Sequence, residues 1–228
     1  MAIDPRRSGA ALWALWVAAG ALGGALATLF VLSPLGAMVS GYGNPAPLPY
    51  NLQFFAYTGA LSAIATSFQS LLLAYVLSMK RAAVLWLLAT LIGASLVADL
   101  FREQFLNFTL SSAFTSLPAD TKQSLMSAGL DAFFPVGLGL VQGLLLMFLT
   151  GRKVALPIWL AGTLLVMPLL GLVRPVWTSP NLFASNASAE AFGAAVTGLA
   201  LVLILRLPRR ARPTAPVLAA RSPLAPTP

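Results

Sequence analysis

Two glutamines, Gln69 and Gln142, begin two stretches of sequence that align without a gap. The stretches are QSLLLAYVLSMKRAAVLWLLATL (69–91) and QGLLLMFLTGRKVALPIWLAGTL (142–164), and besides several leucines they share a glutamine, a lysine, a tryptophan and a threonine at the same offsets. An amide in an apolar segment must find a hydrogen-bond partner, because its burial otherwise costs free energy. Two interpretations stay open: the amides join neighbouring helices, or they form a polar pair along a substrate pathway.

A stripe of hydroxyl residues precedes the first glutamine. Thr58, Ser62 and Thr66 recur at a spacing of four, which places them on one face of a helix. We expect this face to look into protein rather than lipid, where small hydroxyl residues serve close helix packing or line a pathway. The candidate pathway residues are therefore Gln69, Gln142, Thr58, Ser62 and Thr66.

A second group of side chains is of the kind that does acid–base chemistry. These charged residues are expected near one boundary of the membrane, and they are Asp99, Arg102, Glu103, Asp131 and Arg174. Carboxylates at such an edge can act as acid or base, or they can pair with cations and hold the loops in place. No spacing among them matches a hydrolytic motif, so we assign no catalytic residue and do not favour an enzyme.

The chain contains neither cysteine nor histidine. Disulfides, thiolate metal sites and cysteine nucleophiles are therefore excluded, and so is any catalytic arrangement that needs imidazole. We expect no metal site and no cofactor.

The composition determines which elements hold these residues. With 58% hydrophobic and 9% charged residues, the chain differs strongly from an average soluble domain, of which about a quarter is charged. The apolar runs are continuous rather than alternating, which favours helices, and about 20 apolar residues are needed to span a bilayer. We predict an all-α polytopic membrane protein with about six transmembrane helices, at 11–35, 52–79, 82–100, 131–149, 154–173 and 191–207.

The basic residues predict the orientation. With six spans, eleven of the fourteen cations fall on one side, which is expected to be cytoplasmic. Residues 1–10 and the basic, proline-rich tail 208–228, predicted to be disordered, are then both cytoplasmic, and 11–207 is the membrane domain of a bacterial-type plasma membrane protein. Because the cations serve topology, the net charge of +8 does not indicate nucleic-acid binding.

About thirty residues separate the third and fourth predicted spans. Phe101, Phe105 and Phe108 recur there at helical spacing against polar residues. This pattern predicts an amphipathic helix on the membrane surface, followed by a break at the segment 116–120 and a polar helix leading into the fourth span.

Two function classes follow. The repeat of the second and third helices in the fourth and fifth, with its paired glutamines, favours a transport or permease component for a small molecule. The absence of an ionisable residue near the centre of any predicted span favours the alternative, a non-catalytic structural or assembly subunit of a larger membrane complex. The expected partners are the lipid bilayer and either further copies of the chain or other membrane subunits.

Overall fold

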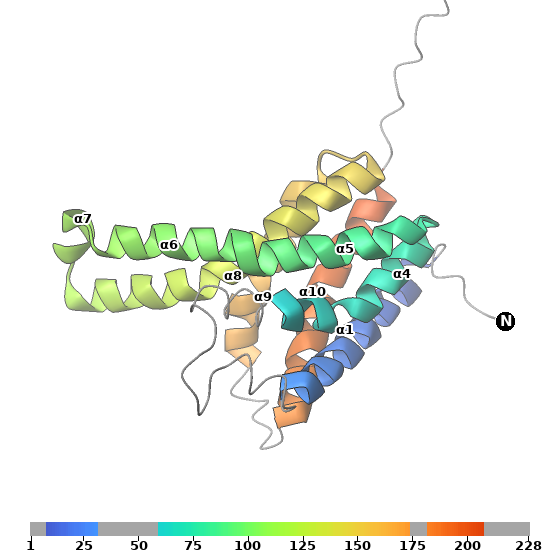
Figure 1. Cartoon of the computed structure of the whole chain (residues 1–228), viewed down its shortest axis with the longest axis horizontal. Coiled ribbons are helices and arrows are strands. Elements are labelled where there is room, and N and C mark those ends of the chain that lie inside the picture. The colour runs from blue at the N-terminus through green and yellow to red at the C-terminus, as the bar shows by residue number, and fades with distance from the viewer. Residues whose placement is uncertain (1–7, 32–58, 174–181, 208–228) are drawn as a thin grey trace, which may run out of the picture.

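The computed structural model describes residues 8–31, 59–173 and 182–207, and within these ranges the chain forms helices and turns but no strand. Figure 1 labels the helices used below. In chain order they are α1 (Gly9–Val31), a short helix (Gly59–Ala65), α4 (Ser67–Leu77), α5 (Lys80–Ile92), η1 (Gly93–Val97), α6 (Ala98–Thr109), α7 (Ser112–Thr115), α8 (Ala119–Thr150), α9 (Ala155–Val173) and α10 (Leu182–Arg206).

Several of these helices are long and apolar enough for an integral membrane protein. Four candidate spans occur among the described residues, at Gly9–Phe30, Lys80–Thr109, Ala132–Thr150 and Ala187–Arg206. The short helix and α4 together make a fifth if they count as one broken span, while the apolar part of α9, Ala155–Leu170, is shorter than the others. Six spans are therefore not confirmed.

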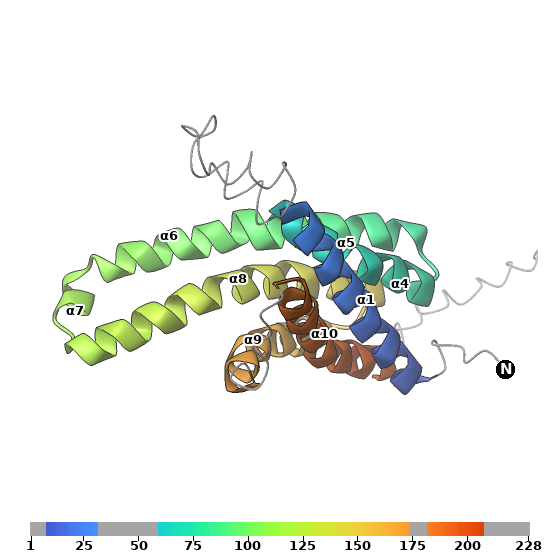
Figure 2. The ribbon, with the colours of Figure 1, turned by 90° about the horizontal axis from the view of Figure 1, so that it is seen from below.

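Three pairs of antiparallel helices form the bundle. Helix α4 packs on α5, α8 packs on α9, and α10 packs on α1, although α10 and α1 lie at opposite ends of the described chain (Figures 1 and 2). The first two pairs are closed by short turns, at Ser78 and Gly151, whose φ angles of 56° and 69° lie in the left-handed region. At the corresponding place in the third pair, the Arg206 side chain lies against Gly9.

The second predicted span is bent rather than straight. The short helix and α4 meet at 54° beside Thr66. At this bend α1 approaches closely: a Cβ on Gly23 would come 1.7 Å from the Ala65 carbonyl oxygen, so only glycine fits. The bend corrects the prediction of one continuous helix, because Ser62 and Gln69 now lie in differently directed segments.

The third predicted span continues beyond its predicted end. Helices α5, η1 and α6 form one uninterrupted rod from Lys80 to Thr109, with a π-helical stretch at Gly93–Val97. The stretch crosses α8 backbone to backbone, since a Cβ on Gly137 would lie 2.5 Å from the Gly93 carbonyl oxygen. Small residues on both helices allow this approach.

Helix α6, the small helix α7 and the first half of α8 form an arm that extends from the bundle in both views (Figures 1 and 2). The helix predicted around Phe101, Phe105 and Phe108 is present, but it continues the span directly, and an interfacial position is not confirmed. Phe105 packs against Gly129 of α8, and the Phe108 ring lies 5.6 Å from the Phe114 ring. The predicted break near 116–120 is present, and α8 begins at Ala119.

Candidate functional site

Three tryptophans meet at the centre of the bundle. Trp16 of α1, Trp86 of α5 and Trp159 of α9 are each at most 2% exposed. Their ring centroids lie 5.3–6.1 Å apart and all three contacts are edge to face. This is the favourable geometry for aromatic quadrupoles, worth ~0.5–1.5 kcal/mol per pair beyond area burial. We call these residues the tryptophan triad.

In each helix pair, one helix carries a tryptophan of the triad and the other helix carries a polar residue near it. These ring residues are Gln69 of α4, Gln142 of α8 and Thr197 of α10, and in each case a fully buried leucine follows four positions later. Trp159 Nε1 donates to Gln142 Oε1 at 3.2 Å, and Trp16 Nε1 donates to Thr197 Oγ1 at 3.3 Å. The Trp86 indole nitrogen is buried without a partner among the described residues.

Gln142 joins three helices. Besides accepting from Trp159 of α9, its Nε2 donates to Thr90 Oγ1 of α5 at 2.8 Å. Thr90 in turn donates to the Trp86 carbonyl oxygen, and Thr163 donates in the same way to the Trp159 carbonyl oxygen. The interpretation of Gln142 as an interhelical hydrogen bond is therefore confirmed, while a role in a pathway stays a prediction.

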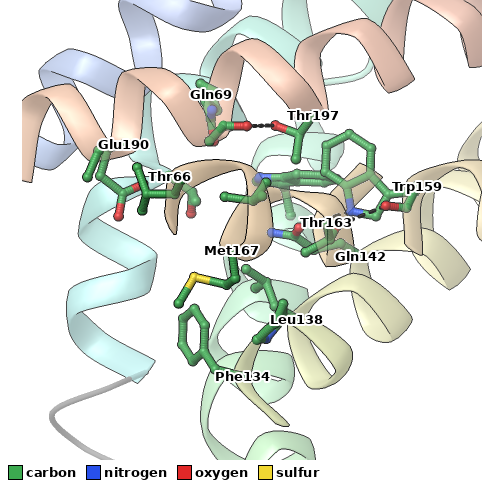
Figure 3. A pocket seen from close by; sticks show the side chains of 17 residues that line it. Thr66, Gln69, Phe134, Leu138, Gln142, Trp159, Thr163, Met167, Glu190 and Thr197 are labelled. Atoms are coloured by element: carbon green, nitrogen blue, oxygen red, sulfur yellow. Dashed lines mark hydrogen bonds between the residues drawn. The ribbon is translucent and has the colours of Figure 1, made fainter. Parts of the chain in front are cut away.

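A cavity of about 190 Å³ lies beside the triad (Figure 3). All three ring residues line it, together with Trp86 and Trp159. The rest of the lining is mainly apolar, including Phe134, Leu138 and Met167 (Figure 3). An apolar cavity of about 150 Å³ is large enough for benzene, so this one suits a molecule of roughly that size or slightly larger.

The cavity has one charged lining residue, Glu190 of α10. Glu190 lies seven residues before Thr197, about 10 Å along the helix at 1.5 Å per residue, and its side chain is exposed, at the rim. The sequence alone did not place Glu190 at a cavity, because only the packing of α10 on α1 and α9 brings it beside residues of α4 and α8. Among the described residues, no group of His, Cys, Asp or Glu could hold a metal ion.

The predicted pathway residues divide into three cases. Gln69, Gln142 and Thr66 line the cavity together (Figure 3). Ser62 does not; its carbonyl oxygen accepts from the Thr66 hydroxyl at 2.9 Å, one turn away. Thr58 lies outside the described residues.

The predicted boundary cluster is not brought to the cavity. Asp99 and Arg102 form an ion pair within α6, and Glu103 is exposed on the same helix. Asp131 lies within α8, and Arg174 lies outside the described residues. Asp99, Arg102 and Glu103 lie in the arm and make no site with the ring residues.

Comparison with protein-family models, with curated proteins and with solved structures gave no match.

Proposed function

We propose that the protein is a transport or permease component of a bacterial-type plasma membrane, with both termini cytoplasmic, and that a small molecule occupies the central cavity on its way across. The supporting observation is that one cavity collects the ring residues of all three helix pairs. Polar groups that converge from several helices on an otherwise apolar cavity are typical of small-molecule sites.

The tryptophan triad gives the cavity a closed end. All three rings are buried and pack edge to face, and Trp86 and Trp159 line the cavity. On the other side the cavity reaches Glu190 at the rim. In this proposal the structure is an outward-facing state, and passage requires the three helix pairs to separate at the triad.

A flux assay tests the proposal. Purified protein in liposomes is offered four radiolabelled solutes: glycerol, acetate, alanine and choline. We expect uptake of at least one above that of protein-free liposomes, and slower uptake by Gln142→Leu at normal amounts of folded protein. Gln123→Leu, at an exposed position of α8 outside the cavity, is the matched control. Background uptake of all four solutes would contradict the proposal.

The arm favours a second candidate function, a non-catalytic assembly subunit. Apart from Phe134 near the middle of α8, it contributes nothing to the cavity. It extends from the bundle, and its Phe101 and Phe108 rings are exposed. If this function holds, other membrane subunits co-purify in constant ratio in mild detergent, and Phe101→Asp removes them while Glu103→Gln does not. Purification of the chain alone, or only with further copies of itself, contradicts this candidate.

A further inference from the structure

We infer that the central cavity is a binding site for a small organic cation, an ammonium group carrying a short apolar body. This inference rests on the proposed function for the direction of passage but not for binding. It follows from three properties of the lining: its charge, its aromatic surface and its mainly apolar remainder.

The charge of the lining is negative. Glu190 is its one ionisable residue, and neither lysine nor arginine is among the lining residues. A cleft lined by one sign of charge attracts ions of the opposite sign. The described lining holds no cation of its own, so a bound cation would supply the counter-charge.

The aromatic surface suits an organic cation. Trp86, Trp159 and Phe134 all line the cavity, and Figure 3 labels Trp159 and Phe134. The faces of such rings attract ammonium groups within about 6 Å of the ring centroid, and most strongly when the site is desolvated. Leu138 and Met167 add apolar contacts for the body of the ligand.

The rest of the lining suits an organic cation better than a bare metal ion. Glu190 is the one carboxylate of the cavity, and most of the other lining side chains are apolar or aromatic. A metal ion needs several oxygen ligands at once, whereas an organic cation also uses aromatic and apolar surface.

Calorimetric titration of the purified protein in detergent tests this site with a matched pair of probes. Choline and 3,3-dimethylbutan-1-ol have the same shape, but only choline is charged. We expect choline to bind at least tenfold more tightly than the alcohol. Glu190→Gln should lower this preference by at least about threefold, toward what the aromatic rings supply alone, and leave binding of the alcohol unchanged. Glu103→Gln, at an exposed carboxylate of α6, should preserve the preference.

Equal affinity for the two probes, or a preference that Glu190→Gln leaves undiminished, would overturn the cation site. Its failure is distinguishable from failure of the proposed function. Uptake of another solute without choline binding refutes the ligand class alone, and choline binding without uptake of any solute refutes transport alone.

A different observation carries a second proposal: we infer that the bundle is a threefold internal repeat whose third unit is formed by α10 and α1. In the two hairpins, we compared whether each of the 23 aligned positions in 69–91 and 142–164 is buried, half-buried or exposed. The two hairpins differ at two of these positions, where Leu77 aligns with Thr150 and Leu91 with Leu164. The third pair repeats this pattern from Gly198 to Leu203, compared with Ser70 to Tyr75.

The same contact between the two helices recurs within each pair. It joins the residue three positions before the ring residue on one helix to the residue four positions after the tryptophan on the other. In the first pair, Thr66 Oγ1 lies 3.4 Å from Thr90 Oγ1. In the second, a Cβ on Gly139 would lie 3.0 Å from the Thr163 Cβ. The third pair has the same contact between Ala194 and Gly20.

Contacts between pairs recur as well. Gln142 Nε2 donates to Thr90, the residue four after Trp86. Gln69 Nε2 lies beside Gly20, the residue four after Trp16: a Cβ placed on Gly20 would be 3.3 Å from this nitrogen. Each glutamine therefore reaches the equivalent position of a neighbouring pair, which is the relation that a rotation about a central axis produces.

Converting the third pair to the residues of the second tests the repeat. Gly20→Thr alone should destabilise the protein, because its Cβ would lie 2.5 Å from the Ala194 Cβ. Adding Ala194→Gly reproduces the combination of Gly139 with Thr163 and should restore much of the lost midpoint of thermal unfolding, although the new Cβ would still lie 3.0 Å from the Glu190 carbonyl oxygen. If Ala194→Gly rescues nothing, or rescues no more than Ala195→Gly does, the third unit is refuted.

Discussion

At the scale of single residues, the three tryptophans of the triad have different hydrogen-bonding states in equivalent places. Trp159 and Trp16 donate to ring residues, whereas the Trp86 nitrogen has no partner in the part of the chain that the structure describes. A buried donor without an acceptor costs about 1–3 kcal/mol. Replacing Trp86 therefore removes an unpaired buried donor, whereas replacing Trp159 leaves the buried Gln142 Oε1 without its donor.

We expect Trp86→Phe to lower the free energy of unfolding by less than Trp159→Phe, with a difference of about 1–3 kcal/mol. Both changes remove similar ring volume from the same cluster, but Trp159→Phe leaves Gln142 Oε1 without its donor. Thermal unfolding of both variants in one detergent measures the difference. Equal losses would mean that the hydrogen bond of Trp159 contributes nothing.

Gln142 itself is the other residue-scale test. Gln142→Leu removes the bonds to Thr90 and from Trp159, and it should cost about 1–3 kcal/mol of stability because the buried Trp159 donor loses its acceptor. The exposed Gln123→Leu should cost less than about 0.5 kcal/mol. A Gln142→Leu variant as stable as wild type would remove the structural role of this amide.

At the scale of helices, the sequence predicted more about local structure than about how helices break. The helical hairpins 69–91 and 142–164 follow from their apolar runs and from basic residues at the turns. The bend at Thr66 and the π-helical stretch Gly93–Val97 do not, because both arise where another backbone approaches: α1 through Gly23, and α8 through Gly137. The periodicity of one segment cannot predict which distant segment will pack against it.

The crossing of η1 and α8 gives an element-scale prediction. Gly137→Leu should destabilise the protein by at least about 1–3 kcal/mol, because the new side chain would force the two backbones apart. Even a Cβ alone at this position would lie 2.5 Å from the Gly93 carbonyl oxygen. Gly193→Ala is the control, since its Cβ would meet only Val166 Cγ1 at 3.4 Å, an ordinary contact. Thermal unfolding again compares the two, and similar midpoints would contradict the close crossing.

At the scale of the whole molecule, the cavity was the least predictable feature. Gln69, Gln142 and Thr66 could be named from their residue types, but Thr197 and Glu190 could not. Their helix, α10, closes the cavity only because it packs on α1 from the other end of the chain. The boundary charges Asp99 and Glu103 were chosen by type too, and they lie on the arm.

The proposed topology is testable directly because the chain has no cysteine of its own. Ser78→Cys, in the turn between α4 and α5, should react with a membrane-impermeant maleimide only after the cells are opened. Ser112→Cys, at the tip of the arm, should react on intact cells. Both side chains are exposed. Labelling of both positions from the same side would invert or break the proposed arrangement.

The tryptophan triad should also give the protein a circular dichroism signal that depends on its packing. Three indoles at 5.3–6.1 Å and nearly perpendicular are close enough for their electronic transitions to couple, and fixed side-chain packing of this kind gives circular dichroism in the near ultraviolet. The intensity of that signal depends on all three helix pairs meeting at one point. Any state in which the pairs separate would lose the coupled band while the helical far-ultraviolet spectrum stays unchanged.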